Sequence, residues 1–129
     1  MTIKNGRNLR IDGTRLWDSL MELAKIGATE KGGVNRQALT DREREGRDLF
    51  VCWCEAAGCT ISVDRVGNIF ARRAGRDNNL APVMMGSHLD TQPLGGKFDG
   101  AYGVLAGLEV IRVLADAEYV TRRPIEVAA

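Results

Sequence analysis

The sequence predicts an α/β fold in which helices flank a mixed sheet, and two observations support this prediction. In the last third of the chain, a strand over 83–87, a helix over 104–117 and a strand over 125–129 follow in the order of a βαβ unit, whose strands run parallel. Upstream, apolar and polar residues alternate over 59–63 and 68–72 on either side of a turn, which predicts an antiparallel hairpin. At 129 residues the chain is long enough for one domain with a single core.

Two further segments predict helices that precede the sheet. Over 14–26, leucines recur at spacings of four and three residues, and Thr14 is placed to cap the start. Thr40 and Glu43 then match a capping box, in which a Thr hydroxyl and a Glu carboxylate satisfy two free amide donors at a helix start. This second helix should run to about Ala57, because a glycine follows.

The βαβ unit is expected to be buried. The run 83–85 is wholly apolar and lies between Pro82 and Gly86, as in a strand that is covered on both faces. The segment 104–117 is apolar almost all round the helix, which is typical of a helix packed against a sheet. Only three charged residues interrupt it: Glu109, Arg112 and Asp116.

The composition excludes several classes of function. With 18 basic and 17 acidic residues the formal charge is +1, so no electrostatic argument favours nucleic acid or an anionic membrane as a partner. No apolar run reaches the roughly 20 residues of a membrane span, and the basic start of the chain lacks the apolar segment of a secretory signal. The cysteines Cys52, Cys54 and Cys59 are odd in number and lack zinc-finger spacing, which predicts a reduced, cytoplasmic protein.

Chemistry-bearing residues gather in GSHLDTQPLGGKFDG, residues 86–100, which contains the only histidine of the chain. His88 and Asp90 come just after the strand 83–87, and Asp99 comes just before the following helix. In α/β sheets, ligands bind at the carboxyl ends of the parallel strands. Imidazole nitrogen and carboxylate oxygen are suitable zinc ligands, and Asp90 is well placed to orient the His88 ring. The glycines of this stretch allow sharp turns and a close approach of the backbone to a ligand.

Spacing alone leaves a structural alternative open for each of these side chains. A single histidine in a loop is more often a hydrogen-bonded structural residue than a metal ligand. A carboxylate just before a helix, such as Asp99, is most often a helix cap.

A family resemblance favours the metal site. The stretch GSHLDTQPLGGKFDGAYGVLAGLEV strongly resembles the amidohydrolases that cleave N-carbamoyl-L-amino acids, together with the related allantoate amidohydrolases and β-ureidopropionases. These belong to the superfamily of aminoacylase- and carboxypeptidase-like zinc hydrolases. H-x-D is shared with the peptidases, whereas TQPLGGKFDG points to the carbamoylase branch. Nearly the whole chain is similar to the N-terminal region of that family, so residues 1–129 are expected to form the N-terminal part of a zinc-exopeptidase-like catalytic domain.

The resemblance implies a site and a reaction. His88 would bind one metal ion, Asp99 would bridge two ions, and Asp90 would support His88. The two divalent ions (zinc, manganese, cobalt or nickel) would polarise the substrate carbonyl and activate a bridging water. The resemblance thus implies a metal-dependent hydrolase of non-peptide C–N bonds in linear amides, with N-carbamoyl-L-amino acids or related ureido compounds as substrates. It also implies a homodimer, formed through a lid domain.

One departure from the family pattern concerns the catalytic glutamates. In the family, two adjacent glutamates, a general base and a metal ligand, follow soon after the strand that corresponds to 125–129, but this sequence ends at Ala129. Glu126 is no substitute, because it lies within the strand and has no acidic neighbour. We therefore expect a truncated, inactive chain whose last strand exposes an unpaired edge. The alternatives are a non-catalytic interaction module or relic, and a peptidase or aminoacylase of the same superfamily.

Overall fold

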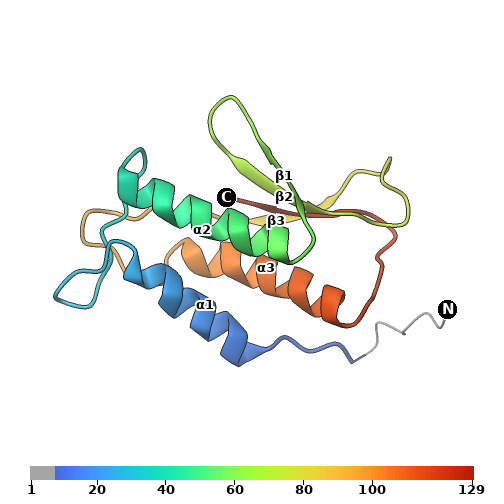
Figure 1. Ribbon diagram of the computed structural model, residues 1–129, viewed down its shortest axis with the longest axis horizontal. Helices are drawn as coiled ribbons and strands as arrows, with labels where there is room; N and C mark the ends of the chain where they lie inside the picture. The colour runs from blue at the N-terminus through green and yellow to red at the C-terminus, as the bar shows by residue number, and fades with distance from the viewer. Residues whose placement is uncertain (1–7) are drawn as a thin grey trace.

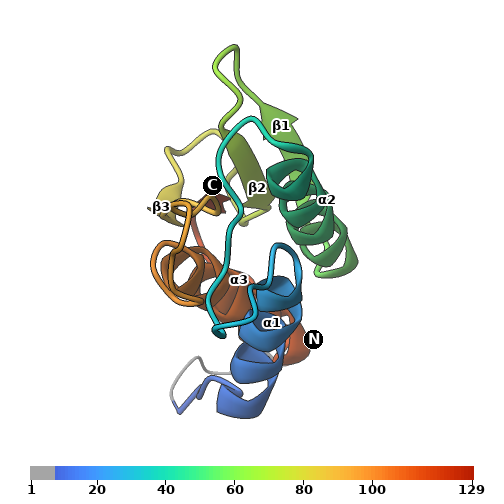
Figure 2. The same cartoon turned by 90° about the vertical axis from the view of Figure 1, so that its left-hand side faces the viewer.

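Three helices lie on one side of a four-stranded sheet in the computed structural model, which describes residues 8–129 (Figures 1 and 2). α2 and α3 pack on the sheet, and α1 packs on α3. The elements follow in the order α1 (Gly13–Lys25), α2 (Asp41–Ala56), β1 (Thr60–Val63), β2 (Ile69–Arg73), β3 (Val83–Gly86), α3 (Ala101–Asp116) and β4 (Ile125–Ala128). The prediction that the chain starts without a secretory signal concerns the N-terminal segment, and residues 1–7 of that segment lie outside the described residues.

The sheet is mixed and has the strand order β1-β2-β4-β3. β1 pairs with β2 and β2 with β4 in antiparallel fashion, whereas β3 and β4 are parallel. The hairpin, the βαβ unit and the predicted fold class are therefore confirmed. Ala71 and Val127 face each other across β2 and β4 and are fully buried beneath the helices. Phe70 and Glu126, on the opposite face, are only partly buried.

Two expectations about the strands are wrong. β4 lies inside the sheet, between β2 and β3, so the last strand does not form an unpaired edge; the edges are β1 and β3. β3 is also not the buried strand that its apolar run predicts, since Val83 and Met84 are each 53% exposed. The reason is that β3 has one neighbour, β4, and is covered by α3 on one face only.

The first helix begins one residue earlier than predicted, and its cap differs. The Oδ1 atom of Asp12, and not the hydroxyl of Thr14, accepts from the amide of Arg15 at 3.0 Å. Asp12 wins because it occupies the extended position just outside the helix, from which a side chain reaches the third amide.

The second helix has half of the predicted capping box. The Thr40 hydroxyl accepts from the Glu43 amide at 3.2 Å. The reciprocal bond is replaced, because the Thr40 amide donates to the Gln37 carbonyl at 3.3 Å and the Glu43 carboxylate lies 3.5 Å from Arg47. The helix ends at Ala56 with Gly58 at a φ of 84°, in agreement with the predicted end.

The third helix starts at Ala101, three residues before the predicted start, and eight of its 16 residues are buried. Glu109, which the sequence presents as a polar interruption, is also fully buried. Its carboxylate accepts from Arg15 at 2.9 Å and from the Asp12 amide at 3.0 Å. This ion pair, buried on the Glu109 side and partly exposed on the Arg15 side, ties the start of α1 to the middle of α3.

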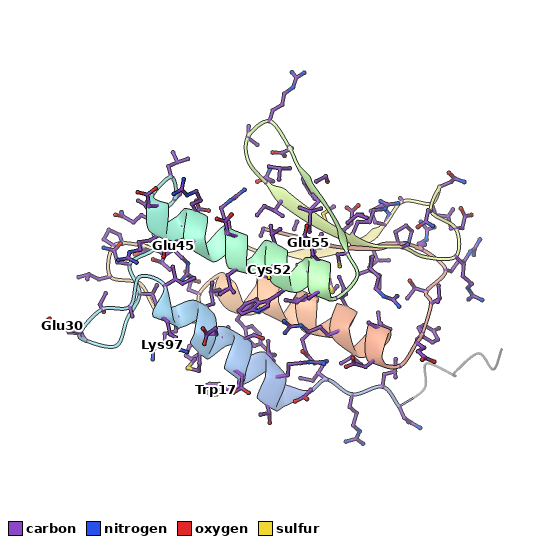
Figure 3. All side chains as sticks on the ribbon, in the orientation of Figure 1. Trp17, Glu30, Glu45, Cys52, Glu55 and Lys97 are labelled. Atoms are coloured by element: carbon purple, nitrogen blue, oxygen red, sulfur yellow. The ribbon has the colours of Figure 1, made fainter. Side chains whose placement is uncertain are left out.

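The cysteines are free thiols at the sites of small apolar residues. Cys54 and Cys59 are buried in the core, and Cys52 is exposed on α2 (Figure 3). Burial raises the pKa of the Cys54 thiol to about 12 and also raises the pKa of Cys59. Within residues 8–129, each helix is too short or too polar to cross a membrane.

Candidate metal centre

The loop between β3 and α3, residues 87–100, carries the predicted site residues at its two ends. His88 follows the carboxyl end of β3, and Asp99 precedes the first turn of α3. The loop is held at its start by the Ser87 amide, which donates to the carbonyl of Ala128 on the parallel neighbour β4 at 3.2 Å. It is therefore the βαβ connection that brings both ends of the loop to one edge of the sheet, where ligands bind in such folds.

The ring of His88 is oriented by Asp90. The Nδ1 atom lies 2.9 Å from the Asp90 main-chain carbonyl and 3.2 Å from Asp90 Oδ1. Both of these oxygens accept hydrogen bonds, so Nδ1 carries the proton, and Nε2 keeps its lone pair in the neutral ring. This is the arrangement in which a histidine is available as a metal ligand through Nε2.

The free nitrogen of His88 faces Asp99. The distance between His88 Nε2 and Asp99 Oδ2 is 3.9 Å, which is too long for a hydrogen bond. Two ligand atoms bound to one tetrahedral zinc ion, each about 2.0–2.2 Å from it, lie roughly 3.4 Å apart. The observed separation exceeds this value by about half an ångström, and the Asp99 side chain is 81% exposed.

Asp99 does not act as a helix cap. The N-cap of α3 is Gly100, and no side chain caps the helix there. Asp99 contributes only its main-chain carbonyl, which accepts from the Ala101 amide at 2.8 Å. Its carboxylate is 81% exposed. Of the two interpretations that the sequence leaves open for this residue, the cap is thus excluded.

Gly100 brings the helix start against His88. Its φ of 72° lies in the left-handed region. A Cβ atom at this position would also lie 2.4 Å from His88 Cε1 and Nδ1. A side chain here would therefore displace the imidazole, and only glycine meets both requirements.

The second half of the loop rests on α1. The ring of Phe98 lies 5.9 Å from that of Trp17, and Lys97 lines a small hollow with Met21 and Ala24 of the same helix (Figure 3 labels Trp17 and Lys97). These contacts fix the approach of the chain to Asp99.

The predicted donor set fits part of a metal centre. Among residues 8–129, no group of three or more His, Cys, Asp and Glu side chains gathers closely enough to hold an ion. His88 and Asp99 offer two donors, while Asp90 is occupied at Nδ1 of His88. Protein zinc sites use at least three protein ligands. Glu126 does not contribute, because it pairs with Arg72 at 2.8 Å on the helix-free face of the sheet.

Sequence reasoning missed one residue beside this loop, namely Arg36. Its side chain is 1% exposed and donates to the main-chain carbonyl of Leu89, between His88 and Asp90. Nothing in the local sequence signals this position, since an arginine in a polar loop is ordinarily exposed.

Comparisons with known proteins identify the chain. A sequence model for the family described as Peptidase family M28 matches residues 68–129, which include the whole loop 87–100. The N-carbamoyl-L-amino-acid amidohydrolase of Rhizobium meliloti is 56% identical over 122 residues, which are 95% of this chain and 29% of the relative. The N-carbamoyl-L-amino acid amidohydrolase of Geobacillus stearothermophilus is 43% identical over 92% of this chain and 29% of its own length.

A solved structure agrees with these sequence relationships. A hydantoinase/carbamoylase family amidase from Burkholderia ambifaria superposes with a TM-score of 0.92 at 64% identity, over 94% of this chain and 30% of that chain. The chain thus spans less than a third of the length of the relatives that it matches. It belongs to the family of N-carbamoyl-L-amino-acid amidohydrolases and related hydantoinase/carbamoylase amidases, and it corresponds to their N-terminal part.

Proposed function

We propose that residues 1–129 form the N-terminal part of the catalytic domain of a metal-dependent amidohydrolase. Its reaction is the hydrolysis of non-peptide C–N bonds in linear amides, with N-carbamoyl-L-amino acids or related ureido compounds as substrates. One observation carries the proposal: His88 Nε2 points at the Asp99 carboxylate from 3.9 Å, while Asp90 holds the opposite nitrogen of the ring. The names of the relatives support the substrate class.

Each residue has a distinct role in this proposal. His88 would hold one divalent ion through Nε2, and the Asp99 carboxylate would be a ligand to both ions of the pair. Asp90 would keep the proton of His88 on Nδ1 and so leave Nε2 free for the metal. When bound, a pair of zinc, manganese, cobalt or nickel ions would polarise the scissile carbonyl and lower the pKa of a bound water. Among residues 8–129 no third His, Cys, Asp or Glu side chain joins these two donors, so the proposal requires a general base and further ligands from elsewhere in the complete gene product.

The proposal also covers the protein's binding partners, its location in the cell and its oligomeric state. A formal charge of +1 supports a small-molecule substrate over nucleic acid or an anionic membrane. Three free cysteines support a reducing, cytoplasmic location. We further propose a homodimer for the complete gene product, on the strength of the family resemblance.

The experiment uses the complete gene product after removal and controlled return of metal. Hydrolysis is measured for an N-carbamoyl-L-amino acid, an N-acetyl-L-amino acid and a dipeptide of the same residue. We expect metal-dependent release of the free amino acid, carbon dioxide and ammonia from the carbamoyl substrate. A ureido compound such as ureidoglycolate is added to the panel, and absence of hydrolysis with all four substrates, at full metal loading, would exclude the enzymatic proposal and leave the non-catalytic interaction module.

A peptidase is the second candidate function, because the matching family model is named for peptidases. The same panel separates the two candidates. Faster turnover of the dipeptide than of the carbamoyl substrate would assign the site to peptide bonds.

A further inference from the structure

We propose that Arg36 is a positioning residue that holds the His88–Asp90 segment in the geometry needed for metal binding. The inference rests on the proposed function, since it concerns the same site. Arg36 lies in the segment between α1 and α2, which meets the loop 87–100 at one end of the molecule (Figure 1).

The side chain of Arg36 is buried with main-chain carbonyls as its partners. Its Nε donates to the Leu89 carbonyl at 2.9 Å, and its Nη1 donates to the carbonyls of Leu23 and Ile26, each at 3.0 Å. The last two are at the carboxyl end of α1, where the helix dipole favours a positive charge. Burying a guanidinium is costly, and an apolar side chain of similar volume would fill this space at a lower cost. The three directed hydrogen bonds therefore do more than fill space.

The main chain of Arg36 is bonded to the same segment. Its amide donates to Thr91 Oγ1 at 2.7 Å, and its carbonyl accepts from the Thr91 amide at 2.8 Å. Leu89 and Thr91 are thus both bonded to one residue, on either side of Asp90. The segment 89–91 is thereby fixed relative to the carboxyl end of α1.

These contacts reach His88 through Asp90. The Leu89 carbonyl belongs to the peptide that joins Leu89 to Asp90, so the Arg36 bond sets the orientation of that peptide. Asp90 in turn presents both its carbonyl and its carboxylate to His88 Nδ1. Burial lowers the pKa of Arg36, and the negative charges of Glu43 and Asp90 oppose this effect.

α2 confines the guanidinium from the other side. A Cβ atom at Gly46 would lie 2.8 Å from Arg36 Cδ and 3.2 Å from Arg36 Nε. Gly46→Ala should therefore push Arg36 away from Leu89 without removing its charge. Gly13→Ala provides the matched control, because Gly13 also lies in a helix and a Cβ there meets nothing within 4 Å.

The test compares Arg36→Met, Arg36→Lys and Gly46→Ala in the complete gene product. Zinc affinity is measured by chelator competition, and the imidazole nitrogen signals of His88 are recorded by NMR without metal, assigned with His88→Gln. Leu114→Ala, near the far end of the 16-residue helix α3, controls for a general loss of core packing.

We expect Arg36→Met and Gly46→Ala to weaken zinc binding about 10- to 100-fold, the usual effect of removing a residue that orients a metal ligand. His88 should also lose its preference for the proton on Nδ1 in both variants. Arg36→Lys should not restore either property, because a lysine cannot make the three directed bonds. Leu114→Ala and Gly13→Ala should leave both unchanged.

The experiment distinguishes failure of the proposed metal site from failure of the proposed role of Arg36. If zinc leaves the His88 signals of the wild-type protein unaltered, the proposed metal site is wrong and the inference falls with it. If zinc binds at His88 in the wild type, and Arg36→Met or Gly46→Ala keeps the affinity and the Nδ1 proton, Arg36 is only a structural residue. Recovery of affinity in Arg36→Lys would likewise overturn positioning in favour of a charge effect. Should Arg36→Met fail to fold, Gly46→Ala decides the question.

Discussion

His88 and Asp99 come from opposite ends of one loop, yet His88 Nε2 and Asp99 Oδ2 lie 3.9 Å apart. Neither of these two atoms holds the loop in place. The Asp99 carboxylate makes no cap bond to α3, and the hydrogen bond of the His88 ring is made by its other nitrogen, Nδ1. Imidazole nitrogen and carboxylate oxygen are both zinc ligands, so this pair is the basis of the proposed metal site.

The carboxylate of Asp90 is predicted to strengthen metal binding through His88. Asp90→Asn keeps the size of the side chain and the main-chain carbonyl that also contacts Nδ1, but it removes the negative charge 3.2 Å from that atom. We expect zinc affinity, measured by chelator competition, to fall about 10-fold, the lower end of the range for such changes. Asp18→Asn, on the exposed side of α1, is the control. An unchanged affinity in Asp90→Asn would show that the carboxylate does not support the ring.

A side chain at Gly100 is predicted to be more harmful than one at Gly32, a glycine with a similar positive φ but more space. Gly100 and Gly32 have φ values of 72° and 83°, and only Gly100 contacts His88. Gly32→Ala should lower the free energy of unfolding by about 1 kcal/mol through backbone strain alone. Gly100→Ala should cost a further 1–3 kcal/mol or so through overpacking. Urea denaturation measures both, and equal losses would mean that the predicted contact with His88 is absent.

The buried carboxylate of Glu109 is predicted to make Arg15 important for stability. Arg15→Met leaves that charge in the core with the Asp12 amide as its remaining hydrogen-bond donor and the positive charge of Arg112 nearby, so we expect a loss of about 3 kcal/mol. Arg44→Met is the matched control, because Arg44 pairs with Asp41 on an exposed surface, where such pairs contribute under about 1 kcal/mol. Similar losses in the two variants would contradict a special role for burial.

The hairpin turn between β1 and β2 is predicted to make stability depend on pH in acid. Hydrogen bonds from Asn68, foremost that of its side chain, and from neighbouring amides hold the pKa of Asp64 below its ordinary value of 3.8. A carboxyl whose pKa is lower in the folded state stabilises the fold above the unfolded-state pKa. That contribution is lost as the pH falls from about 4 through the folded-state pKa. Asp64→Asn should therefore flatten the fall in unfolding free energy below about pH 4. A profile as steep as that of the wild type would contradict this assignment.

Local patterns predicted the elements well, and long-range pairing decided what they could not. The positions of the three helices, the hairpin and the βαβ unit follow from spacing and turn residues that lie close together in the chain. The insertion of β4 between β2 and β3 depends on pairing with a distant hairpin, so the sequence gives no local sign of it, and the exposure of Val83 and Met84 follows from it.

The same distinction holds at the candidate site. His88, Asp90 and Asp99 can be found from the sequence because they share one short loop and a recognisable motif. Arg36 cannot, because its role depends on carbonyls of α1 and of the loop 87–100, and any polar segment can contain an arginine. Every residue has a main-chain carbonyl, so the sequence does not indicate which carbonyls will accept a hydrogen bond from a distant side chain.

The most direct test of the metal site is anomalous diffraction at the zinc edge from crystals of the complete gene product grown with zinc. The account predicts a zinc peak within bonding distance of both His88 Nε2 and an Asp99 carboxylate oxygen, about 2.0–2.2 Å from each. Zinc bound elsewhere, with no ion between His88 and Asp99, would contradict it.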